Sequence, residues 1–279
     1  MPELPEVETI KRQLQKSIAG KTIKSAEVLY PRFIGMDAKK FKKTIIGAKI
    51  KNIRRRAKLL ILDISNNFSI MCHLKMTGRL SFSRNSTQNG PSLIINKHAQ
   101  VIYSFSGGGQ LVHSDIRKFG YAKLMPTEDL DKILSQEYGP EPLESVFTEK
   151  KLAEIISNRP NQKAKQFLMD QKNIAGIGNI YADEILFFAG IMPVRKIFSL
   201  SKIEIKKLFT GIKKILTDAV KYRGSSISDY RDSHGKAGEY HLKLKVYGRE
   251  KLPCPKCKTP ISKIKLHGRG THFCANCQK

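Results

Sequence analysis

The first residues of the chain combine a candidate nucleophile with a group that can carry protons. The N-terminus reads MPELPEVET and places Pro2 directly before Glu3. Proline is small enough for the initiator Met1 to be removed, which would leave a secondary amine with a pKa of about 7.7 to 8.0, against about 10.4 for lysine. Far more of this amine than of a lysine is unprotonated at neutral pH, so it can attack a sugar C1′ and form a cationic iminium. Glu3 beside it can move protons.

An ordinary helix start accounts for part of the same stretch. Pro5 suits the first helical position, and Glu6 and Glu8 would interact favourably with the positive end of the helix dipole. This explanation leaves Pro2 and Glu3 without a role, so both are candidate catalytic residues.

Four of the five cysteines form two C-x-x-C pairs separated by sixteen residues, namely Cys254 with Cys257 and Cys274 with Cys277. This spacing is typical of a tetrathiolate zinc site, and a pair of redox dithiols is the alternative. Four thiolates leave no open position on the metal, so we expect one structural zinc ion that takes no part in chemistry. The fifth, Cys72, lies in an apolar segment and is predicted to be a buried thiol.

Two further patterns have both a structural and a DNA-binding interpretation. In AGIGNIYADE, Gly176 and Gly178 open a predicted helix, and Asn179 adds a side-chain donor. Tyr181 replaces the third glycine of a dinucleotide-binding motif and no strand precedes it, which excludes that fold. Backbone N–H groups here could approach a phosphate, although ordinary helix-turn packing explains the glycines equally well.

The segments HLKMTG and DIRKFG carry His73, Met76, Arg117 and Phe119 beside predicted strands. A single histidine is usually structural, and methionine or phenylalanine usually belongs to a core. In a strongly basic protein, an arginine and two bulky apolar side chains on loops can instead form a wedge that unstacks bases.

The charge favours a polyanionic partner. The 279 residues include 51 Lys and Arg against 24 Asp and Glu, a formal net charge of +27. Residues 240–279 alone hold ten Lys or Arg and one acid. Nucleic acid is favoured over a surface charged for solubility and over an anionic membrane, because no lipidation or long amphipathic pattern is present. No apolar run approaches about eighteen residues and no signal peptide is evident, so we expect a cytosolic protein without a membrane partner.

Periodicity predicts an α+β protein. Val7, Ile10, Leu14 and Ile18 recur at helical spacing and indicate a short amphipathic helix that follows the opening acids and closes near Gly20. An antiparallel β-sandwich is expected over about 20–126, from strand-like segments at 22–29, 44–53, 58–64, 68–74, 92–105 and 121–125. Helices are expected at 127–136, 148–157, 161–171, 179–189 and from Ser201, where Glu204 completes a capping box, to Gly224. A polar loop follows, and its length suggests a function or disorder.

These motifs together resemble the formamidopyrimidine-DNA glycosylase family of bacterial base-excision repair enzymes. The similarity runs nearly end to end in the family order: MPELPEVET, RRAKLLIL, HLKMTGRL, DIRKFG, FLMDQKNIAGIGNIYADEILF, VYGRE and GRGTHFCANCQ. Two departures stand out, namely Lys75 where a glycine is more usual, and EKLPC before the first cysteine pair.

The resemblance implies a fold and a domain organisation. It implies an N-terminal helix and β-sandwich, a helical domain with a helix-two-turn-helix, a zinc-finger β-hairpin, and DNA binding in the cleft between the lobes. We accordingly predict domains at 1–135, 136–239 and 240–279, with a lesion-capping loop at 225–238. It also implies a monomer that binds double-stranded DNA containing oxidised bases, in the cytoplasm of a bacterium and associated with the nucleoid.

The resemblance also implies roles. Pro2 would be the nucleophile, Glu3 the general acid and base, and Glu6 a support for the amine or sugar. Lys58, counted with the catalytic residues, would bind phosphate near the lesion. The other expected DNA contacts are His73, Lys165, Asn179 and Arg269, together with Met76, Arg117 and Phe119, which would fill the gap left by an everted nucleotide.

The implied activity is excision of oxidised purines through a Schiff base on Pro2, followed by strand cleavage by β- and δ-elimination. An endonuclease VIII-like glycosylase acting on oxidised pyrimidines is the nearest alternative, but the ELPEVET opening and the DIRKFG segment favour the purine enzyme. A non-catalytic zinc-ribbon protein would explain the charge and the cysteines, but it would give no reason for Pro2 and Glu3.

Overall fold

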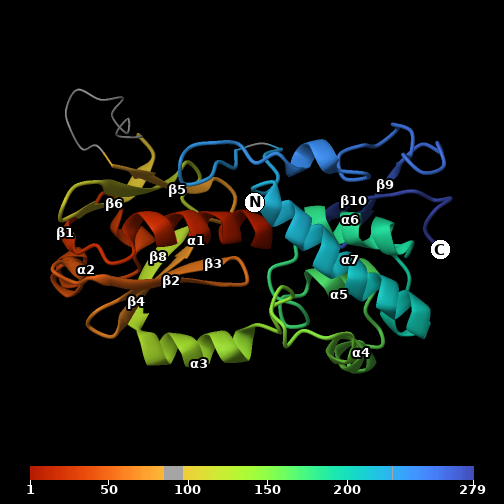
Figure 1. Ribbon diagram of the computed structural model, residues 1–279, viewed down its shortest axis with the longest axis horizontal. Coiled ribbons are helices and arrows are strands. Elements are labelled where there is room, and N and C mark those ends of the chain that lie inside the picture. The colour runs from red at the N-terminus through yellow and green to blue at the C-terminus, as the bar shows by residue number, and fades with distance from the viewer. Residues whose placement is uncertain (85–96, 228) are drawn as a thin grey trace. The chain divides into compact units, whose positions relative to one another are not determined.

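The protein divides into two compact units. The computed structural model describes residues 1–84, 97–227 and 229–279 (Figure 1). Unit 1 comprises Met1–Gln136 and Arg223–Glu239, and unit 2 comprises Glu137–Tyr222 and Tyr240–Lys279. The described residues of the 225–238 loop therefore cluster with the sandwich, whereas the domain boundaries predicted from sequence place this loop in the helical domain. The domain boundaries predicted from sequence stay a prediction.

Unit 1 begins with the predicted amphipathic helix. Helix α1 spans Leu4–Ile18, and its apolar stripe at Val7, Ile10, Leu14 and Ile18 is fully buried. The helix starts one residue earlier than expected, with Glu3 as its N-cap, so Pro5 occupies the second helical position. α1 packs against strands of both sheets described below, which fixes its N-terminus relative to them.

The described part of unit 1 contains two four-stranded antiparallel sheets, as predicted for a sandwich. The first has the order β1-β6-β7-β5, with β1 Ile23–Val28, β6 Ala99–Phe105, β7 Gln110–Asp115 and β5 Gly78–Ser83. The second has the order β2-β3-β4-β8, with β2 Ile50–Arg56, β3 Leu59–Ile64, β4 Phe68–His73 and β8 Tyr121–Pro126. Inward-facing Ile, Leu, Val and Phe residues of both sheets and α1 form one buried cluster.

Three details of unit 1 differ from the sequence-based expectation. Helix α2, Ala38–Ile45, was not expected, and the strand expected from 44 begins only at β2. Asp37 caps this helix by accepting from Lys40 N, and Phe41 and Ile45 bury one helical face, so helical packing outweighs the β-branched residues. Strands β5 and β7 were also missed, and the part of the expected 92–105 strand before residue 97 lies outside the described residues.

The remaining elements of the described chain are mostly helical. They are the short 3₁₀ turns η1 Pro31–Phe33, η2 Ile197–Ser199 and η3 Tyr240–Lys243, and the helices α3 Thr127–Glu137, α4 Glu149–Ser157, α5 Ala164–Met169, α6 Asn179–Ala189 and α7 Lys202–Lys221. The predicted capping box of Ser201 and Glu204 starts α7. α6 packs against α5, α7 and the hairpin, so it forms the centre of unit 2. None of the helices in the described ranges is both long enough and apolar enough to cross a membrane.

Unit 2 ends in the predicted β-hairpin, made of β9 Ser262–Leu266 and β10 Arg269–Phe273. Its two turn residues, His267 and Gly268, have φ of 46° and 75°. Positive φ at both positions is the geometry of the turn that suits the twist of a tight hairpin. The turn therefore places Arg269 at the start of the second strand.

Candidate active site and nucleic-acid interface

The carboxylate of Glu6 joins the N-terminus to the 223–239 segment within unit 1. Glu6 Oε2 accepts a hydrogen bond from Glu3 N at 2.8 Å, and Oε1 accepts one from Ser225 N at 2.6 Å. Both glutamates are buried, Glu3 at 2% and Glu6 at 1% exposure. Two short bonds to rigid backbone hold the Glu6 side chain, and with it the backbone at Glu3, in one position.

Two glycines let the chain approach this carboxylate. Gly224 has φ of 78°, and a Cβ atom built on it would lie 2.5 Å from Glu6 Oε1. A Cβ atom at Gly238 would lie 2.3 Å from Gly224 O. Neither position has room for a side chain, so the 223–239 segment can close over Glu6 only because both residues are glycine.

Pro2 precedes the N-cap Glu3 and is buried, whereas Met1 is 43% exposed. On the loop side, the Tyr230 hydroxyl donates to Glu6 O at 3.4 Å. Burial, together with the charge of Glu6, raises the pKa of Tyr230, so its hydroxyl stays protonated as a donor. The structure thus gathers Pro2, Glu3 and Glu6 at one helix end, although the roles predicted for them stay predictions.

Lys58 lies in the two-residue turn between β2 and β3, and Leu59 after it pairs with His73 on β4. Burial, followed by the charges of Lys75 and Lys58, lowers the pKa of His73 to about 3. His73 is therefore neutral near pH 7, and its Nδ1 accepts a hydrogen bond from Lys75 N at 2.9 Å. In this arrangement His73 orders the following turn.

Lys75, where a glycine was noted as more usual, has φ of 50°. Glycine adopts this left-handed conformation without the steric cost of a Cβ atom, so the backbone explains why glycine would suit the position. The bond from Lys75 N to His73 helps to hold the lysine in that conformation. The substitution therefore leaves the turn closed.

A buried aspartate that sequence analysis missed connects the two predicted wedge segments. Asp115 is 1% exposed and ends β7. Its Oδ1 accepts from the Thr77 hydroxyl and, at 3.2 Å, from Arg117 N, while Oδ2 accepts from Gly120 N at 2.7 Å. Because one carboxylate bonds both the HLKMTG turn and the DIRKFG loop, their positions are coupled.

The three predicted wedge side chains are all exposed on these two segments. Met76 is 42% exposed and Phe119 is 56% exposed. The guanidinium of Arg117 lies 4.6 Å from the centre of the Phe119 ring. None of the three contributes to the buried core, so a purely structural interpretation of Phe119 has little support.

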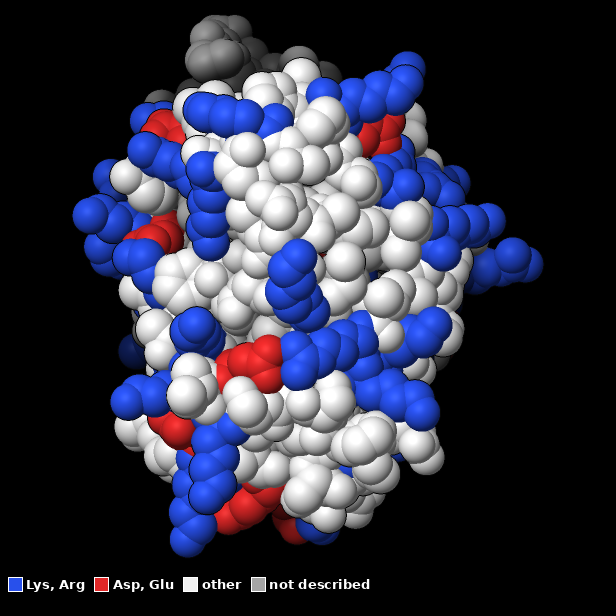
Figure 2. Space-filling model, turned by 90° about the vertical axis from the view of Figure 1, so that its right-hand side faces the viewer, with Lys and Arg blue, Asp and Glu red and all other residues white. Residues whose placement is uncertain are grey.

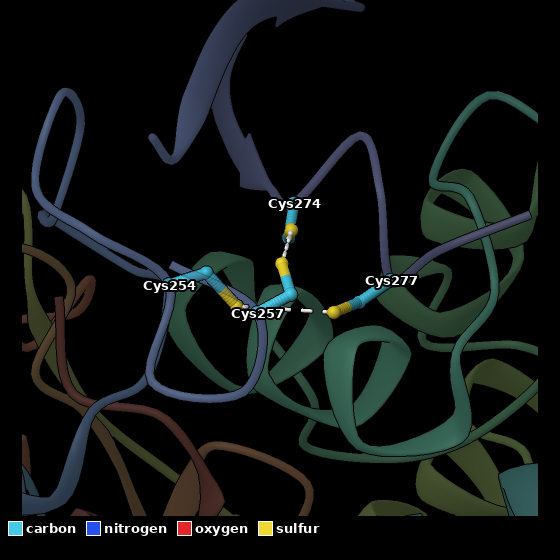
Figure 3. Close-up of side chains that lie close together, drawn as sticks. All are labelled: Cys254, Cys257, Cys274 and Cys277. Atoms are coloured by element: carbon cyan, nitrogen blue, oxygen red, sulfur yellow. Dashed lines mark hydrogen bonds between the residues drawn. The ribbon is translucent and has the colours of Figure 1, made fainter. Parts of the chain in front are cut away.

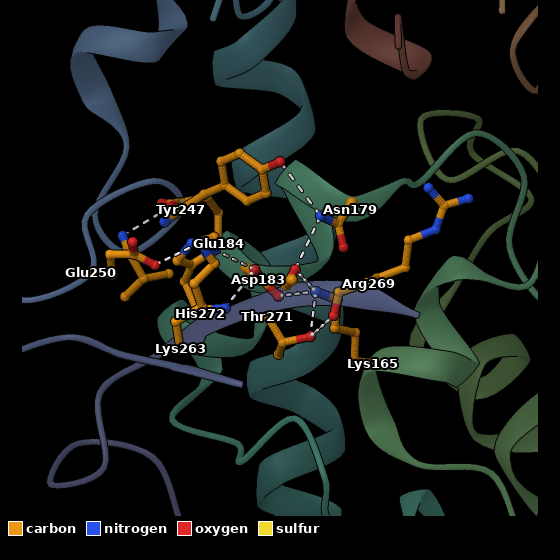
Figure 4. Close-up of polar contacts among 12 residues, drawn as sticks. Lys165, Asn179, Asp183, Glu184, Tyr247, Glu250, Lys263, Arg269, Thr271 and His272 are labelled. Atoms are coloured by element: carbon orange, nitrogen blue, oxygen red, sulfur yellow. Dashed lines mark hydrogen bonds and ion pairs between the residues drawn. The ribbon is translucent and has the colours of Figure 1, made fainter. Parts of the chain in front are cut away.

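In unit 2, Lys165 is buried and engaged rather than exposed (Figure 4). Its ammonium lies 2.7 Å from Asp183 Oδ1, 3.0 Å from Gly270 O and 2.9 Å from Thr271 Oγ1. These contacts join α5, α6 and β10. A direct phosphate contact by Lys165, as predicted, would have to replace one of these bonds, so its role stays a prediction.

Asn179 begins α6 and bonds to the same hairpin. Its Nδ2 donates to Gly270 O at 3.1 Å, while its Oδ1 is buried without a hydrogen-bond partner in the described chain. Gly176 N, proposed above as a phosphate donor, instead donates to Gln171 Oε1 at 2.8 Å. Gln171 also donates to Ile177 O, so it organises the turn before α6.

Two adjacent acids of α6 anchor the hairpin region, and sequence analysis missed both. Asp183 Oδ2 accepts from His272 N at 2.9 Å. Glu184, 1% exposed, accepts from the backbone of residues 245–247 at 2.9 to 3.1 Å. Burial raises the pKa of Glu184, and these three bonds partly oppose the increase. A pair of acids in an otherwise apolar helix was the sequence clue to this role.

The four cysteines predicted to bind zinc meet at the base of the hairpin (Figure 3). Their sulfurs all lie within 4.8 Å of one another, with 3.4 Å between Cys257 and Cys274. A tetrahedral site with Zn–S bonds of about 2.3 Å needs sulfurs roughly 3.8 Å apart. The sulfurs point toward one another in Figure 3, so the set fits one zinc ion with no open position.

The zinc site is joined to the helices of unit 2. Gln278 is fully buried, accepts from Cys274 N at 2.8 Å and donates to Ile191 O at 2.8 Å. Arg269 is exposed at the other end of the hairpin, and its side chain points away from the polar network in Figure 4. Figure 2 shows Lys and Arg side chains across much of one face of the protein, with acidic side chains in small patches between them.

This fold and these sites define a class of protein. Its members are basic proteins with a β-sandwich unit and a helical unit that carries a tetrathiolate zinc finger. Three family models match the chain in order: the formamidopyrimidine-DNA glycosylase N-terminal domain over 1–122, the formamidopyrimidine-DNA glycosylase H2TH domain over 138–231, and the zinc finger found in FPG and IleRS over 251–279. The chain therefore belongs to the formamidopyrimidine-DNA glycosylase family.

Similar proteins support this membership over the full length. Formamidopyrimidine-DNA glycosylase from Pelotomaculum thermopropionicum is 41% identical and matches 100% of this chain and 99% of its own length. The protein of the same name from Listeria monocytogenes is also 41% identical, with 100% of both chains matched. The Lactococcus lactis Fpg, solved in complex with DNA containing an abasic site, is 38% identical, with a TM-score of 0.88 and 99% of both chains matched. The family, the fold class and the zinc site predicted from sequence are confirmed.

Proposed function

We propose that this protein is a bifunctional DNA glycosylase and AP lyase that excises oxidised purines, such as 8-oxoguanine and formamidopyrimidines, from double-stranded DNA. The observation that supports this proposal most strongly is the pair of buried glutamates, Glu3 and Glu6, next to Pro2. The Glu6 carboxylate accepts hydrogen bonds from the backbone N–H groups of Glu3 and Ser225. The related Lactococcus lactis protein has been solved with DNA containing Fapy-dG and with DNA containing an abasic site. A substrate lesion and the site left after base loss are the ligands expected for this activity.

The first step requires the amine of Pro2. While Met1 is attached, this nitrogen is an amide without a nucleophilic lone pair, so Met1 must be removed. The amine then forms a bond to C1′ of the damaged nucleotide and the glycosidic C–N bond breaks, with the electron pair leaving on the base. The nitrogen then gives up its proton, the C1′–O4′ bond breaks with its electron pair on O4′, which takes up a proton, and the nitrogen lone pair forms the C1′=N double bond. The resulting iminium between Pro2 and C1′ is cationic without a proton on nitrogen.

Glu3 and Glu6 have different tasks in this proposal. Glu3, next to the nucleophile, moves protons between the amine, the sugar and the departing base. Glu6 has both oxygens bonded to backbone N–H groups, so it orients the N-terminus rather than exchanging protons. A negative charge on each glutamate also stabilises the cationic iminium.

Strand cleavage follows from the iminium. Loss of a C2′ proton drives β-elimination, which breaks the C3′–O bond, and δ-elimination then breaks the C5′–O bond. The four zinc-bound cysteines take no part in these steps, because a tetrathiolate has no open coordination position.

Basic and exposed apolar residues would hold the DNA. Lys58 and Arg269 would contact phosphates. Asn179 and Lys165 would support the hairpin that carries Arg269, because both donate to Gly270 O. Met76, Arg117 and Phe119 would occupy the space of the everted nucleotide. His73 acts indirectly by ordering the turn that carries Met76. We place the enzyme in the cytoplasm, associated with the nucleoid and acting as a monomer.

Borohydride trapping tests the assignment of the nucleophile. Borohydride added during turnover on duplex DNA with 8-oxoguanine opposite cytosine should reduce the iminium to a stable protein–DNA adduct that maps to the N-terminal peptide. An adduct on Lys58, unchanged in yield by Pro2→Gly, would show that the nucleophile is wrong.

A second comparison tests the substrate class. Strand cleavage at 8-oxoguanine should exceed cleavage at thymine glycol, and the reverse order would favour the pyrimidine-specific alternative.

Glu3→Gln should lose base excision while keeping affinity for lesion DNA, because the change removes a proton carrier and little binding. Equal loss of excision and affinity would instead indicate a structural role for Glu3.

A further inference from the structure

Unit 2 contains a cavity that the proposed chemistry does not use. Its volume is about 420 Å³, within the usual range for a ligand site. One wall is a face of α6 with Glu184, Phe187 and Phe188, and another is a face of α7 that includes Ile215. Tyr240, Lys243 and Lys245 complete the lining, together with Pro255 and Lys256, which lie between the two cysteines of the first pair.

The floor of the cavity is apolar and aromatic. Tyr222 and Tyr240 both line it, with ring centres 6.5 Å apart. Phe187 is 3% exposed and Ile215 is 9% exposed, so their side chains form a firm surface rather than a mobile one. Burial and the nearby carboxylates raise the pKa of Tyr240, whose hydroxyl therefore stays protonated near pH 7.

The rim of the cavity is strongly cationic. It carries five lysines from three segments of the chain: Lys214 and Lys221 of α7, Lys243 and Lys245, and Lys256 beside the zinc site. Two of the ammonium groups lie over rings of the lining, Lys243 5.1 Å from the centre of Tyr222 and Lys256 4.6 Å from that of Phe187.

The acids at the cavity do not cancel this charge. Glu184 is bonded to three backbone N–H groups of residues 245–247. Asp218 lies 3.7 Å from Lys214 on the same face of α7. Among the described residues, the two acids of the lining thus leave most of the five rim lysines without a paired carboxylate. The site is therefore complementary to a negatively charged occupant with an apolar group.

We propose that this cavity binds an acidic peptide segment of a partner protein, with one aromatic side chain seated on the floor and carboxylates paired to the rim lysines. The distribution of the lysines favours a peptide over a nucleotide. A nucleotide concentrates its charge at one end, whereas acidic residues on both sides of an aromatic residue match cations that come from three segments. The surface thus links the protein to another protein, independently of its proposed action on DNA.

Fluorescence anisotropy with the full-length, zinc-loaded protein tests this binding. The probes are a labelled peptide Asp-Asp-Phe-Asp-Asp and its matched Asp-Asp-Ala-Asp-Asp, at an ionic strength of about 0.15 M to screen general attraction. The phenylalanine peptide should bind at least tenfold more tightly than the alanine peptide. Equal affinities would overturn the proposal, because the aromatic floor would then contribute nothing.

A pair of charge-matched variants separates the cavity from the overall charge. The double variant Lys221→Glu with Lys243→Glu changes two exposed rim lysines, and Lys206→Glu with Lys207→Glu makes the same charge change on exposed residues of α7 outside the lining. The rim variant should lose at least tenfold in peptide affinity and the control less than twofold. Equal losses would mean that only net charge is sensed.

A short oligothymidine tests whether the cavity prefers nucleic acid to the acidic peptide. It should fail to displace the phenylalanine peptide at concentrations that exceed the peptide Kd tenfold. Displacement that depends on Lys221 and Lys243 would show that the cavity prefers nucleic acid and would overturn the peptide assignment. Zinc content and melting temperature of both double variants, equal to those of the parent, confirm that affinity changes arise at the surface.

Discussion

Gly224 lies against Glu6 so closely that a Cβ atom on it would stand 2.5 Å from the carboxylate oxygen Oε1. The next residue, Ser225, donates its backbone N–H to that same oxygen at 2.6 Å. The glycine and the hydrogen bond therefore act together. Gly224 lets the backbone approach the Glu6 carboxylate, and the hydrogen bond from Ser225 N holds the carboxylate there. Disturbing the glycine should displace Glu6 while every proposed catalytic side chain is retained.

Gly224→Ala should reduce excision strongly, by about tenfold or more, because Glu6 must move and the N-terminus with it. Gly235→Ala is the matched control, since Gly235 also has φ of 78° in the same segment but nothing lies within 4 Å of its Cβ position. Backbone strain should cost each variant about 1 kcal/mol of unfolding free energy, and Gly224→Ala should lose more because its Cβ also meets Glu6. Melting curves and single-turnover rates measure the two effects. Similar rates in the two variants would contradict a role for the Gly224–Glu6 contact.

Phe119→Ala should slow excision from duplex DNA while leaving the melting temperature nearly unchanged, because Phe119 is 56% exposed. Eversion of a base costs a few kcal/mol of stacking and pairing, and this cost is largely absent in single-stranded DNA. Lesions in single strands and abasic sites in duplex DNA should therefore be cut almost normally. A uniform loss on all three substrates with a large fall in melting temperature would return Phe119 to a structural role.

Asp115→Ala should reproduce this substrate pattern from a buried position. It removes the carboxylate that accepts from Thr77, Arg117 and Gly120, so the two loops lose their shared support. We expect an added loss of about 1 to 3 kcal/mol in unfolding free energy from the donors left unpaired. Full excision from duplex DNA in a demonstrably less stable variant would show that loop coupling is dispensable.

Cys274→Ser should release zinc, disorder the hairpin and weaken DNA binding by at least tenfold, because metal ligation supplies much of the folding free energy of so small a module. Cys72→Ala is the control and should retain zinc, since Cys72 lies in the sandwich core. Burial raises the pKa of the Cys72 thiol to about 12, so it should stay unreactive toward thiol reagents in folded protein. Metal-free protein with full DNA affinity would contradict the structural role of zinc.

Unfolding free energy should fall as the pH drops from about 6.5 toward 3. Burial lowers the pKa of His113 to about 3 and that of His73 to about 3, so below pH 6.5 the unfolded chain binds protons that the folded chain does not. Each histidine can contribute a slope of up to about 1.4 kcal/mol per pH unit. His113 is buried, and neither ring nitrogen has a hydrogen-bond partner in the described ranges. His113→Leu should therefore reduce the slope in denaturant titrations between pH 4 and 6.5, and an unchanged slope would show that His113 takes up its proton over the same pH range in the folded and unfolded states.

Local patterns predicted much of the molecule. The helix from Leu4, the capping box of Ser201 and Glu204, and the cysteine pairs depend on residues a few positions apart, and near neighbours share the same element. The alternation of apolar residues likewise indicated strands of a sandwich. Helix α2 and strands β5 and β7 were missed because burial against the rest of unit 1, rather than local propensity, decides their conformation.

The partners of the functional side chains were decided by tertiary structure. Sequence alone determined the family, the fold class, the zinc ligands and the residues to test at the N-terminus, because those signals are short and contiguous. Glu6 and Ser225 are 219 positions apart, and His272 and Asp183 are 89 apart. Hydrogen bonds at such separations form only after the chain has folded, and no periodicity encodes them. For that reason only the structure showed that the 223–239 segment supports Glu6. The same holds for the coupling of the two loops by Asp115 and for the ion pair between Lys165 and Asp183.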